Sequence, residues 1–388
     1  MFRIYIPVKI HSELPQPYRD KILVERLASS IRSIPLLSPI KIMHVCGTHE
    51  NAISRFGIRD LLPDGVTVIA GPGCPVCVCP TQDIELAMDL ALEKGVILAT
   101  FGDMVRAPST KGTLLDTRAK GGDVRIVYSP FDVLKIAEEN PDKEAVLFSV
   151  GFETTACGVA SLVQSMPPKN LSFLISHRLI PPAMEFLLGV GDLYIDGFLI
   201  PGQVTTVRGL EEYRLFPVAY RMPVVSAGFE PVDVLMGILM ILRQIKDKKP
   251  GCENAYKRAV KETGNPKAKE AIKQVFDIVF SYWRGIGRIP RSGLILKERY
   301  KDKDARYRFG LSEGESIIDL NPGCSCHLIM IGKINPAECP LFKTTCTPQT
   351  PYGPCMVSFE GTCNSWYRFT SPLLRLRCLP EVLFQPSL

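Results

Sequence analysis

The chain has 388 residues, of which 46% are hydrophobic and 22% are charged. This composition predicts a globular protein of two or three domains and excludes a fibrous or disordered chain. The 46 Lys and Arg residues only slightly outnumber the 40 Asp and Glu residues. Because the basic residues are scattered rather than grouped with aromatic ones, we expect no nucleic-acid partner.

The longest apolar run is VLMGILMIL at 234–242, about half of what a membrane span requires, and it predicts a buried helix. The N-terminal stretch MFRIYIPVKIHSELP lacks the features of a secretory signal. We therefore expect a cytoplasmic protein with no membrane partner. Disulfides are transient in that compartment, so the 13 cysteines indicate metal or redox chemistry.

Between residues 40 and 245, short β-rich runs alternate with Gly- or Pro-containing turns and amphipathic helices. This order predicts βα units, parallel sheets and an α/β fold of doubly wound, Rossmann-like domains. Stretches 246–269 and 285–305 carry charges, Pro and Gly and are expected to be connections. The predicted strands are KIMHV (41–45), VTVIA (66–70), VILATF (96–101), AVLFSV (145–150), LSFLIS (171–176), GFLIP (197–201) and PVVSA (223–227).

Reactive side chains occur at or just after the carboxyl ends of these predicted strands. In open parallel sheets, ligands bind at this edge, where loops lead into helix N-termini. We therefore expect one functional site there. The candidate residues are Cys46, His49, Cys74, Cys77, Glu153 and His177.

The sequence CPVC at 74–77 is a Cys-x-x-Cys pair followed closely by a predicted helix. A helix N-terminus favours the thiolate, so Cys74 and Cys77 could be redox-active or bind a metal transiently. The spacing also permits a disulfide. Half of a structural zinc site and a pair of inert loop thiols are the alternatives, and Cys79 is interpreted as a bystander.

The sequence CGTHE at 46–50 places a thiol and an imidazole three positions apart, and both Cys46 and His49 suit iron. A buried core cysteine is the alternative for Cys46. Glu153 and His177 could position ligands or protons by hydrogen bonding. A helix-capping carboxylate and a core histidine with satisfied hydrogen bonds are the alternatives for that pair.

Six cysteines between 324 and 363, interleaved with Pro and Gly, predict a segment that folds around a metal. Their wide spacing favours an iron–sulfur cluster over zinc, which prefers two Cys-x-x-Cys pairs, and a disulfide knot is the alternative. Two of the six could form a redox pair beside a four-thiolate site. The six are Cys324, Cys326, Cys339, Cys346, Cys355 and Cys363, whereas Cys252 and Cys378 are interpreted as incidental.

Several separated motifs resemble the HypD family of hydrogenase maturation proteins: CGTHE, GPGCPVC, FSVGFETTA, ECPLF and GPCMVSFEGTC. The resemblance spans roughly residues 40–370. It implies two α/β domains and a C-terminal [4Fe–4S] domain. We expect an N-terminal helical extension at 1–34, a first α/β domain at 35–130 with 225–295 that carries Cys46, Cys74 and Cys77, a second at 131–224, and the cysteine-rich domain at 296–388.

The resemblance also implies a function. HypD-like proteins act with a HypC-like chaperone to assemble the Fe(CN)2(CO) unit of [NiFe]-hydrogenase, with cyanide arriving from a HypE-like donor that is charged by HypF. By motif, Cys46 would bind the Fe(II) that acquires CN and CO ligands, and Cys74 and Cys77 would relay electrons. The [4Fe–4S] ligands would be Cys324, Cys339, Cys346 and Cys363, which leaves Cys326 and Cys355 as an accessory pair.

The chain departs from the family pattern at PGQVT, where Gln203 replaces the histidine of the PGHVS segment, and at Asn51, where some members carry a histidine. Glutamine can donate a hydrogen bond but cannot shuttle protons near neutral pH. A cluster-dependent thiol–disulfide reductase and a zinc-stabilised binding module are the alternative functions. The sequence contains no phosphate-binding G-x-x-x-x-G-K-[ST] loop.

Overall fold

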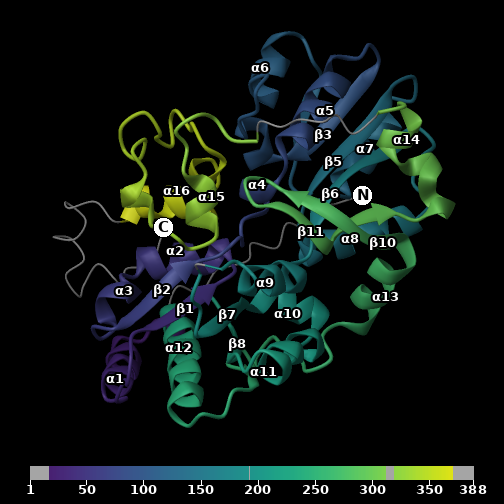
Figure 1. Ribbon diagram of the computed structural model, residues 1–388. Coiled ribbons are helices and arrows are strands. Elements are labelled where there is room, and N and C mark those ends of the chain that lie inside the picture. The colour runs from purple at the N-terminus through teal and green to yellow at the C-terminus, as the bar shows by residue number, and fades with distance from the viewer. Residues whose placement is uncertain (1–16, 192, 312–318, 370–388) are drawn as a thin grey trace, which may run out of the picture.

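Two β-sheets and a cysteine-rich C-terminal segment make up the computed structural model, which describes residues 17–191, 193–311 and 319–369 (Figure 1). The five-stranded sheet is entirely parallel and has the order β2-β1-β7-β8-β9. Its strands are β1 (Ile40–His44), β2 (Val66–Ala70), β7 (Gly197–Pro201), β8 (Val224–Ala227) and β9 (Cys252–Asn254).

The six-stranded sheet has the order β10-β11-β6-β5-β3-β4, with four parallel strands and an antiparallel hairpin at one edge. Strands β5 and β6 are buried along nearly their whole length, because helices cover both faces of a parallel sheet. The strands are β3 (Val96–Phe101), β4 (Val124–Val127), β5 (Glu144–Gly151), β6 (Leu171–Arg178), β10 (Phe276–Trp283) and β11 (Gly287–Leu296).

Helices form the outer layers, and their apolar faces pack on the sheets. In α1, the buried residues are Val24, Ala28 and Ile31. They are three and four positions apart, which places them on one face of the helix. The longer helices are α1 (Lys21–Arg32), α2 (Gly47–Arg55), α5 (Thr81–Leu92), α7 (Asp132–Glu139), α8 (Glu153–Gln164), α9 (Ile180–Leu188), α12 (Pro231–Lys246) and α13 (Pro266–Val275). The shorter ones in this part are α3 (Ile58–Leu61), α4 (Pro75–Val78), α6 (Leu114–Ala119), α10 (Gly202–Arg208) and α11 (Leu215–Ala219).

The cysteine-rich segment, described over residues 319–369, contains short helices. Its buried side chains belong to the same hydrophobic core as residues of both sheets. Helix α16 packs against α2, and the turn at Pro354–Met356 packs against α4. Figure 1 shows this yellow segment beside α2. Its helices are α15 (Cys326–Met330) and α16 (Thr362–Phe369), whereas the preceding α14 (Ala305–Arg308) packs on β6 of the six-stranded sheet.

The α/β class and the two parallel-dominated sheets are confirmed, as are the seven predicted strands and the buried helix, which is the middle of α12. Stretch 285–305 is not only a connection, because it contains most of β11. Within the expected N-terminal extension, residues 21–32 form α1, whereas residues 1–16 lie outside the described residues, as does Cys378. No helix in the described ranges has the length and hydropathy needed to span a membrane.

The strands are distributed between the sheets differently from the expected domain ranges. Strands β3 and β4, within 35–130, belong to the six-stranded sheet, and so does the β10–β11 hairpin. Strand β7, within 131–224, belongs to the five-stranded sheet. The chain therefore crosses between sheets after β2, after β6 and after β9, and the composition of a strand does not record which sheet it joins.

Candidate thiol site

Cys46 and the CPVC loop lie side by side because β1 and β2 are neighbouring parallel strands whose carboxyl ends face the same way. The backbone N–H of Gly47 donates to the carbonyl of Gly73 over 3.0 Å. A Cβ atom added to Gly73 would lie only 2.2 Å from the backbone nitrogen of Cys46. The two loops are thus in direct backbone contact, and only glycine fits between them.

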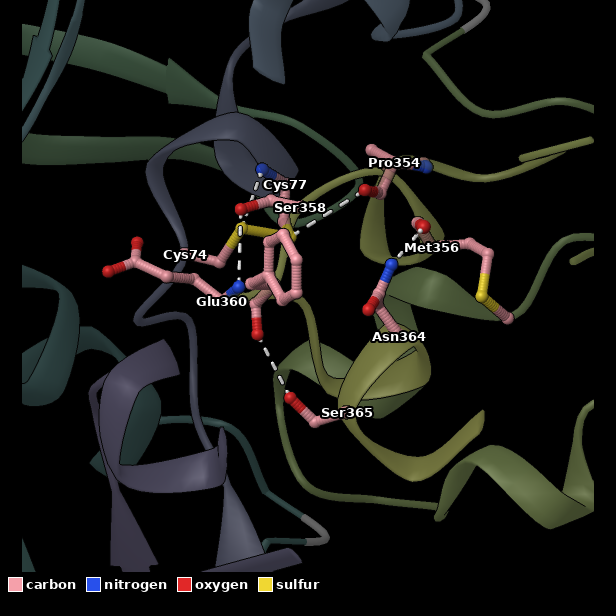
Figure 2. The surroundings of a disulfide bond; sticks show 9 residues. Cys74, Cys77, Pro354, Met356, Ser358, Glu360, Asn364 and Ser365 are labelled. Carbon is pink, nitrogen blue, oxygen red and sulfur yellow. Dashed lines mark hydrogen bonds between the residues drawn. A yellow bond between two sulfur atoms is a disulfide. The ribbon is translucent and has the colours of Figure 1, made fainter. Parts of the chain in front are cut away.

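A disulfide joins Cys74 and Cys77 in the structure, and both residues are buried (Figure 2). Cys74 occupies the N-cap of α4, where its sulfur accepts a hydrogen bond from the backbone N–H of Cys77 over 3.2 Å. The sulfur of Cys77 lies 3.8 Å from the carbonyl oxygen of Pro354. The pair is therefore covered by the cysteine-rich segment, with Cys355 next in the chain.

Cys46 is 2% exposed and occupies the N-cap of α2. Gln203, in the first turn of α10, donates a hydrogen bond from Nε2 to its sulfur over 3.2 Å. Burial and then the negative charge of Glu360 raise the pKa of Cys46 to about 11, whereas the Gln203 hydrogen bond and nearby backbone N–H groups oppose this increase. Cys46 is therefore protonated at neutral pH when no metal is bound.

Glu360 also belongs to this site, although no pattern in the sequence singles it out as a candidate. Its Oε1 accepts from the hydroxyl of Thr48 over 3.0 Å, and its backbone packs so closely on α2 that a Cβ at Gly47 would lie 2.2 Å from its carbonyl oxygen. Figure 2 shows the residue beside the disulfide. Burial raises the pKa of its carboxyl group. The only signal for Glu360 in the sequence is its place in the SFEGTC motif.

A cleft of about 700 Å³ opens beside the disulfide. The loop of the CPVC motif, the N-terminal half of α8 and the SFEG stretch all contribute to its walls. The cleft can admit a small ligand or a partner's chain to the side of the disulfide loop. Its lining residues at these three places are Pro75, Val76, Thr154, Thr155, Gly158, Ser358, Phe359 and Glu360.

His49 is buried and points toward the loop after β8 rather than into this cleft. Its Nε2 lies 3.3 Å and 3.0 Å from the carbonyl oxygens of Ala227 and Gly228, and its ring packs on Phe229 with centroids 5.0 Å apart. Burial lowers the pKa of His49 to about 3. The imidazole is therefore neutral and holds the end of β8 against α2.

The neighbouring Glu50 organises a buried polar network. Its carboxylate accepts from His44, at 2.8 Å, from Arg59, at 2.9 and 2.8 Å, and from the hydroxyl of Ser54. The indole N–H of Trp366, on α16, also donates to it over 3.1 Å. The charge of Arg59 and the bond from His44 hold the pKa of Glu50 well below its usual range despite burial. This network connects the five-stranded sheet to the cysteine-rich segment.

Glu153 and His177 lie at adjacent strand ends in the other sheet, with Gly151 and His177 paired across β5 and β6. Glu153 accepts from the backbone N–H of Ile180 over 2.9 Å, and burial raises its pKa to about 7. Nε2 of His177 lies 2.8 Å from the hydroxyl of Ser149, and burial lowers its pKa to about 3. Neither residue lines the cleft.

The six C-terminal cysteines are buried without exception. The thiol of Cys355 contacts those of Cys326 and Cys363, and these contacts lower its pKa. Cys326 also contacts Cys324, so the expected accessory pair and two expected cluster ligands lie together. Cys346 interacts electrostatically with Cys324 and Cys326 and accepts from backbone N–H groups.

These thiols fit an iron–sulfur cluster in donor chemistry, because buried thiolates that accept backbone hydrogen bonds are its usual ligands. The loop around Gly353 approaches closely, since a Cβ there would lie 2.4 Å from the sulfur of Cys324 and 2.7 Å from that of Cys326. Across residues 17–191, 193–311 and 319–369, no group of three or more His, Cys, Asp or Glu side chains has the spacing of a metal site. The thiols are instead packed against one another.

The fold and the site define an α/β protein in which a buried thiol adjoins a disulfide-forming pair and a cysteine-rich segment. Comparison with known proteins agrees with this class. The HypD model, described as "Hydrogenase formation hypA family", matches residues 22–370. The chain belongs to the HypD family.

Three relatives illustrate the similarity. Hydrogenase maturation factor HypD2 of Bradyrhizobium diazoefficiens is 42% identical over 364 residues, which are 91% of this chain and 95% of the relative. A putative hydrogenase expression/formation protein of Methanocaldococcus jannaschii is 42% identical over 358 residues, 90% of this chain and 98% of the relative. Hydrogenase maturation factor HypD of Escherichia coli is 42% identical over 335 residues, which are 85% of this chain and 89% of the relative.

Proposed function

We propose that this protein is a hydrogenase maturation factor that binds iron through Cys46 and supports assembly of the Fe(CN)2(CO) unit on that iron. The similarity to hydrogenase maturation factors of other organisms supports the general role. The observation that carries the finer proposal is the backbone contact between the Cys46 turn and the loop of the Cys74–Cys77 disulfide. An iron ligand and a two-electron thiol couple are thereby held next to each other.

Iron binding at Cys46 is coupled to loss of a proton. With a pKa of about 11, the thiol releases its proton when Fe(II) takes its place, so affinity increases with pH. The Glu360 carboxylate favours the cation by its charge, and the N–H of Gln203 favours a negatively charged sulfur. A soft thiolate in a dry site suits iron that also carries cyanide and carbon monoxide.

The Cys74–Cys77 disulfide is the proposed redox element. Reducing it to two thiols consumes two electrons and two protons, and reoxidation returns them. His49, Glu153 and His177 are proposed to act as positioning residues, since each is buried and bonded to a neighbouring element. A bound [4Fe–4S] cluster would supply single electrons, and Cys324, Cys339, Cys346 and Cys363 would hold it, with Cys326 and Cys355 as the accessory pair.

The proposed partners are a HypC-like chaperone and a HypE-like cyanide donor charged by HypF, all in the cytoplasm. The cleft beside Pro75 and Glu360 is the proposed entry for the partner segment that shares the iron. Glu360 lines this cleft and acts on Cys46 by its charge, which supports an approach of the partner's thiolate from this side.

The test is anaerobic co-purification with a HypC-like protein, followed by infrared spectroscopy of cyanide and carbonyl stretches. Cys46→Ser is compared with Cys252→Ser, a matched substitution at a thiol in β9. We expect the bands to vanish in the first variant and persist in the second. Bands that persist in Cys46→Ser would show that Cys46 is not the iron ligand. The alternative function, a thiol–disulfide reductase, would be favoured by a different pair of results. The wild type would show no bands, and Cys46→Ser would turn over a dithiol substrate at the wild-type rate.

A further inference from the structure

Arg284 follows the last residue of β10 and lies between α4 and the cysteine-rich segment. Its side chain is 1% exposed. The backbone N–H donates to the carbonyl of Val78 over 2.9 Å, Nε donates to the carbonyl of Asp319 over 2.8 Å, and one terminal nitrogen donates to the carbonyl of Pro108 over 2.7 Å. The other terminal nitrogen is buried and has no hydrogen-bond partner in the structure.

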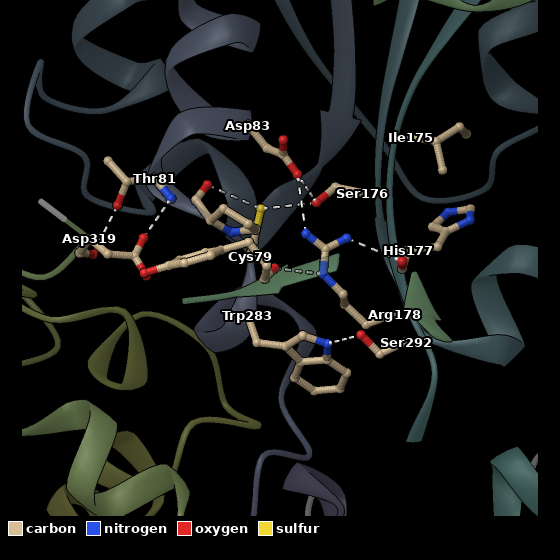
Figure 3. A network of polar contacts seen from close by, with 12 residues as sticks. Cys79, Thr81, Asp83, Ile175, Ser176, His177, Arg178, Trp283, Ser292 and Asp319 are labelled. Atoms are coloured by element: carbon tan, nitrogen blue, oxygen red, sulfur yellow. Dashed lines mark hydrogen bonds and ion pairs between the residues drawn. The ribbon is translucent and has the colours of Figure 1, made fainter. Parts of the chain in front are cut away.

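The neighbouring carboxylates are engaged with other groups (Figure 3). Asp83 forms ion pairs with Arg178, at 3.4 Å, and with Arg306, at 2.7 Å. The carboxylate of Asp319 accepts from two backbone N–H groups, and only its backbone carbonyl meets Arg284. No carboxylate among the described residues forms an ion pair with Arg284. Within the described ranges, its buried positive charge therefore has no ion-paired carboxylate.

The charge of Arg284 acts on cysteine thiols on both sides of it. They are Cys79, on the α4 side, and Cys324 and Cys355, on the other. Burial, followed by the charge of Asp83, raises the pKa of Cys79 to about 12, so that thiol is neutral and cannot balance Arg284. The next residue, Gly285, packs so closely on α15 that a Cβ there would lie 2.9 Å from the Cβ of His327.

A buried charge is costly unless an opposite charge accompanies it, and an unsatisfied buried N–H requires an explanation. Thiolates of the cysteine-rich segment would provide both the negative charge opposite the guanidinium and an acceptor for its unpaired N–H. A cluster held by four thiolates has a net negative charge, and reduction adds one more. Such a group would meet Arg284 across a dry interface, where electrostatic interactions are strong.

We propose, on the basis of the proposed function, that Arg284 is a positioning residue that supplies the counter-charge for the cysteine-rich segment and favours the reduced state of the cluster bound there. The step concerned is the uptake of one electron from an external one-electron donor, such as dithionite, by the oxidised cluster. No bond is formed or broken in this step. Removing the charge from position 284 lowers the reduction potential.

The experiment is a redox titration, followed by electron paramagnetic resonance, of the anaerobically reconstituted full chain. Arg284→Met is compared with Arg284→Lys, which retains the charge, and with Arg106→Met. Arg106 is the matched control because its guanidinium also donates to carbonyls of the cysteine-rich segment, at Pro348 and Val357. Iron and sulfide contents are measured for every sample.

We expect the reduction equilibrium in Arg284→Met to shift at least tenfold toward the oxidised state, about 59 mV for a one-electron couple, with Arg284→Lys and Arg106→Met close to the wild type. Loss of the cluster in Arg284→Met alone would also support the proposal. Equal potentials in all four proteins would overturn it, and so would equal shifts or cluster loss in Arg284→Met and either comparison variant. A wild type that binds no cluster would overturn the cluster assignment itself, and this inference with it.

Discussion

The side-chain amide of Gln203 donates a hydrogen bond to the sulfur of Cys46 and links the first turn of α10 to the end of β1. Gln203, which stands where the resemblance leads us to expect a histidine, thus interacts with the proposed iron ligand itself. It does so as a neutral donor that cannot titrate in the physiological range. The reactivity of Cys46 in this chain should therefore follow the ionisation of the thiol alone.

Replacing Gln203 by Met removes this donor while preserving side-chain volume, and it should raise the pKa of Cys46 above about 11. A hydrogen bond to a charged group contributes about 1.5–3 kcal/mol, so the thiolate fraction at a fixed pH below the pKa should decrease roughly 10- to 100-fold. Iodoacetamide labelling of the Cys46 peptide, followed by mass spectrometry, measures this decrease. Gln274→Met, at an exposed helix position, is the control, and equal rates in both variants would contradict the role of the hydrogen bond.

Glu360→Gln should have the opposite effect, because the charge of Glu360 is one of the two causes that raise the pKa of Cys46. Removing that charge while preserving shape should lower the pKa and speed labelling of Cys46 several-fold at the same pH. Glu298→Gln serves as the control, because it removes a carboxylate that is exposed and pairs with Lys301. Slower labelling in Glu360→Gln would mean that the carboxylate acts as a base rather than as a charge.

Gly73→Ala should separate the two loops of the thiol site. The added methyl group cannot remain 2.2 Å from the Cys46 nitrogen, so the backbone must shift, which typically costs about 1–3 kcal/mol. We expect urea denaturation to report this loss and iron binding to decrease with it. Gly191→Ala is the control, because a Cβ there meets nothing within 4 Å. A Gly73→Ala protein with wild-type stability and iron content would disprove the close contact.

Glu50→Gln should weaken the attachment of the cysteine-rich segment to the five-stranded sheet. The substitution leaves Arg59 without its charge partner and disturbs acceptors for His44 and Trp366. Breaking a buried pair in this way costs about 3–5 kcal/mol, which denaturation with urea at neutral pH would measure. Glu25→Gln, at an exposed site on α1, should change stability by less than about 0.5 kcal/mol. Similar losses in both variants would show that Glu50 has no special structural role.

The sequence was informative where one physical rule determined the outcome. Continuous apolar runs such as AVLFSV predicted buried parallel strands. The placement of Cys46 and the CPVC loop after the carboxyl ends of predicted strands led us to expect them in one site, and the pairing of β1 with β2 brings them together. The orientation of His49 was not predictable, because it depends on how α2 turns against the loop after β8. The position of Glu360 near Cys46, from which it is separated by more than 300 residues, was not predictable either. It depends on the tertiary packing of a segment whose sequence has no helical or strand periodicity. Sheet membership of β3 and β7 likewise depends on crossovers that leave no local signal.

The carboxyl group of Glu153 provides a test of pH dependence. Burial raises its pKa from 4.5 to about 7 in the folded protein, so the folded state binds a proton more tightly than the unfolded state. Stability therefore decreases as pH increases from about 4.5 to about 7, and the full cost is present above that range. Since one pKa unit corresponds to about 1.4 kcal/mol, the cost at pH 8 should be on the order of 3 kcal/mol.

Glu153→Gln removes this cost, because an amide oxygen can still accept from Ile180 and never ionises. The variant should match the wild type near pH 4.5 and become more stable than it by about 3 kcal/mol near pH 8, with the difference developing between these values. Urea denaturation across this range measures the difference. Glu138→Gln, at an exposed position of α7, should show no such trend. A difference between Glu153→Gln and the wild type that is constant with pH would mean that Glu153 is already ionised at the lower pH, and that its second oxygen reaches an unseen donor.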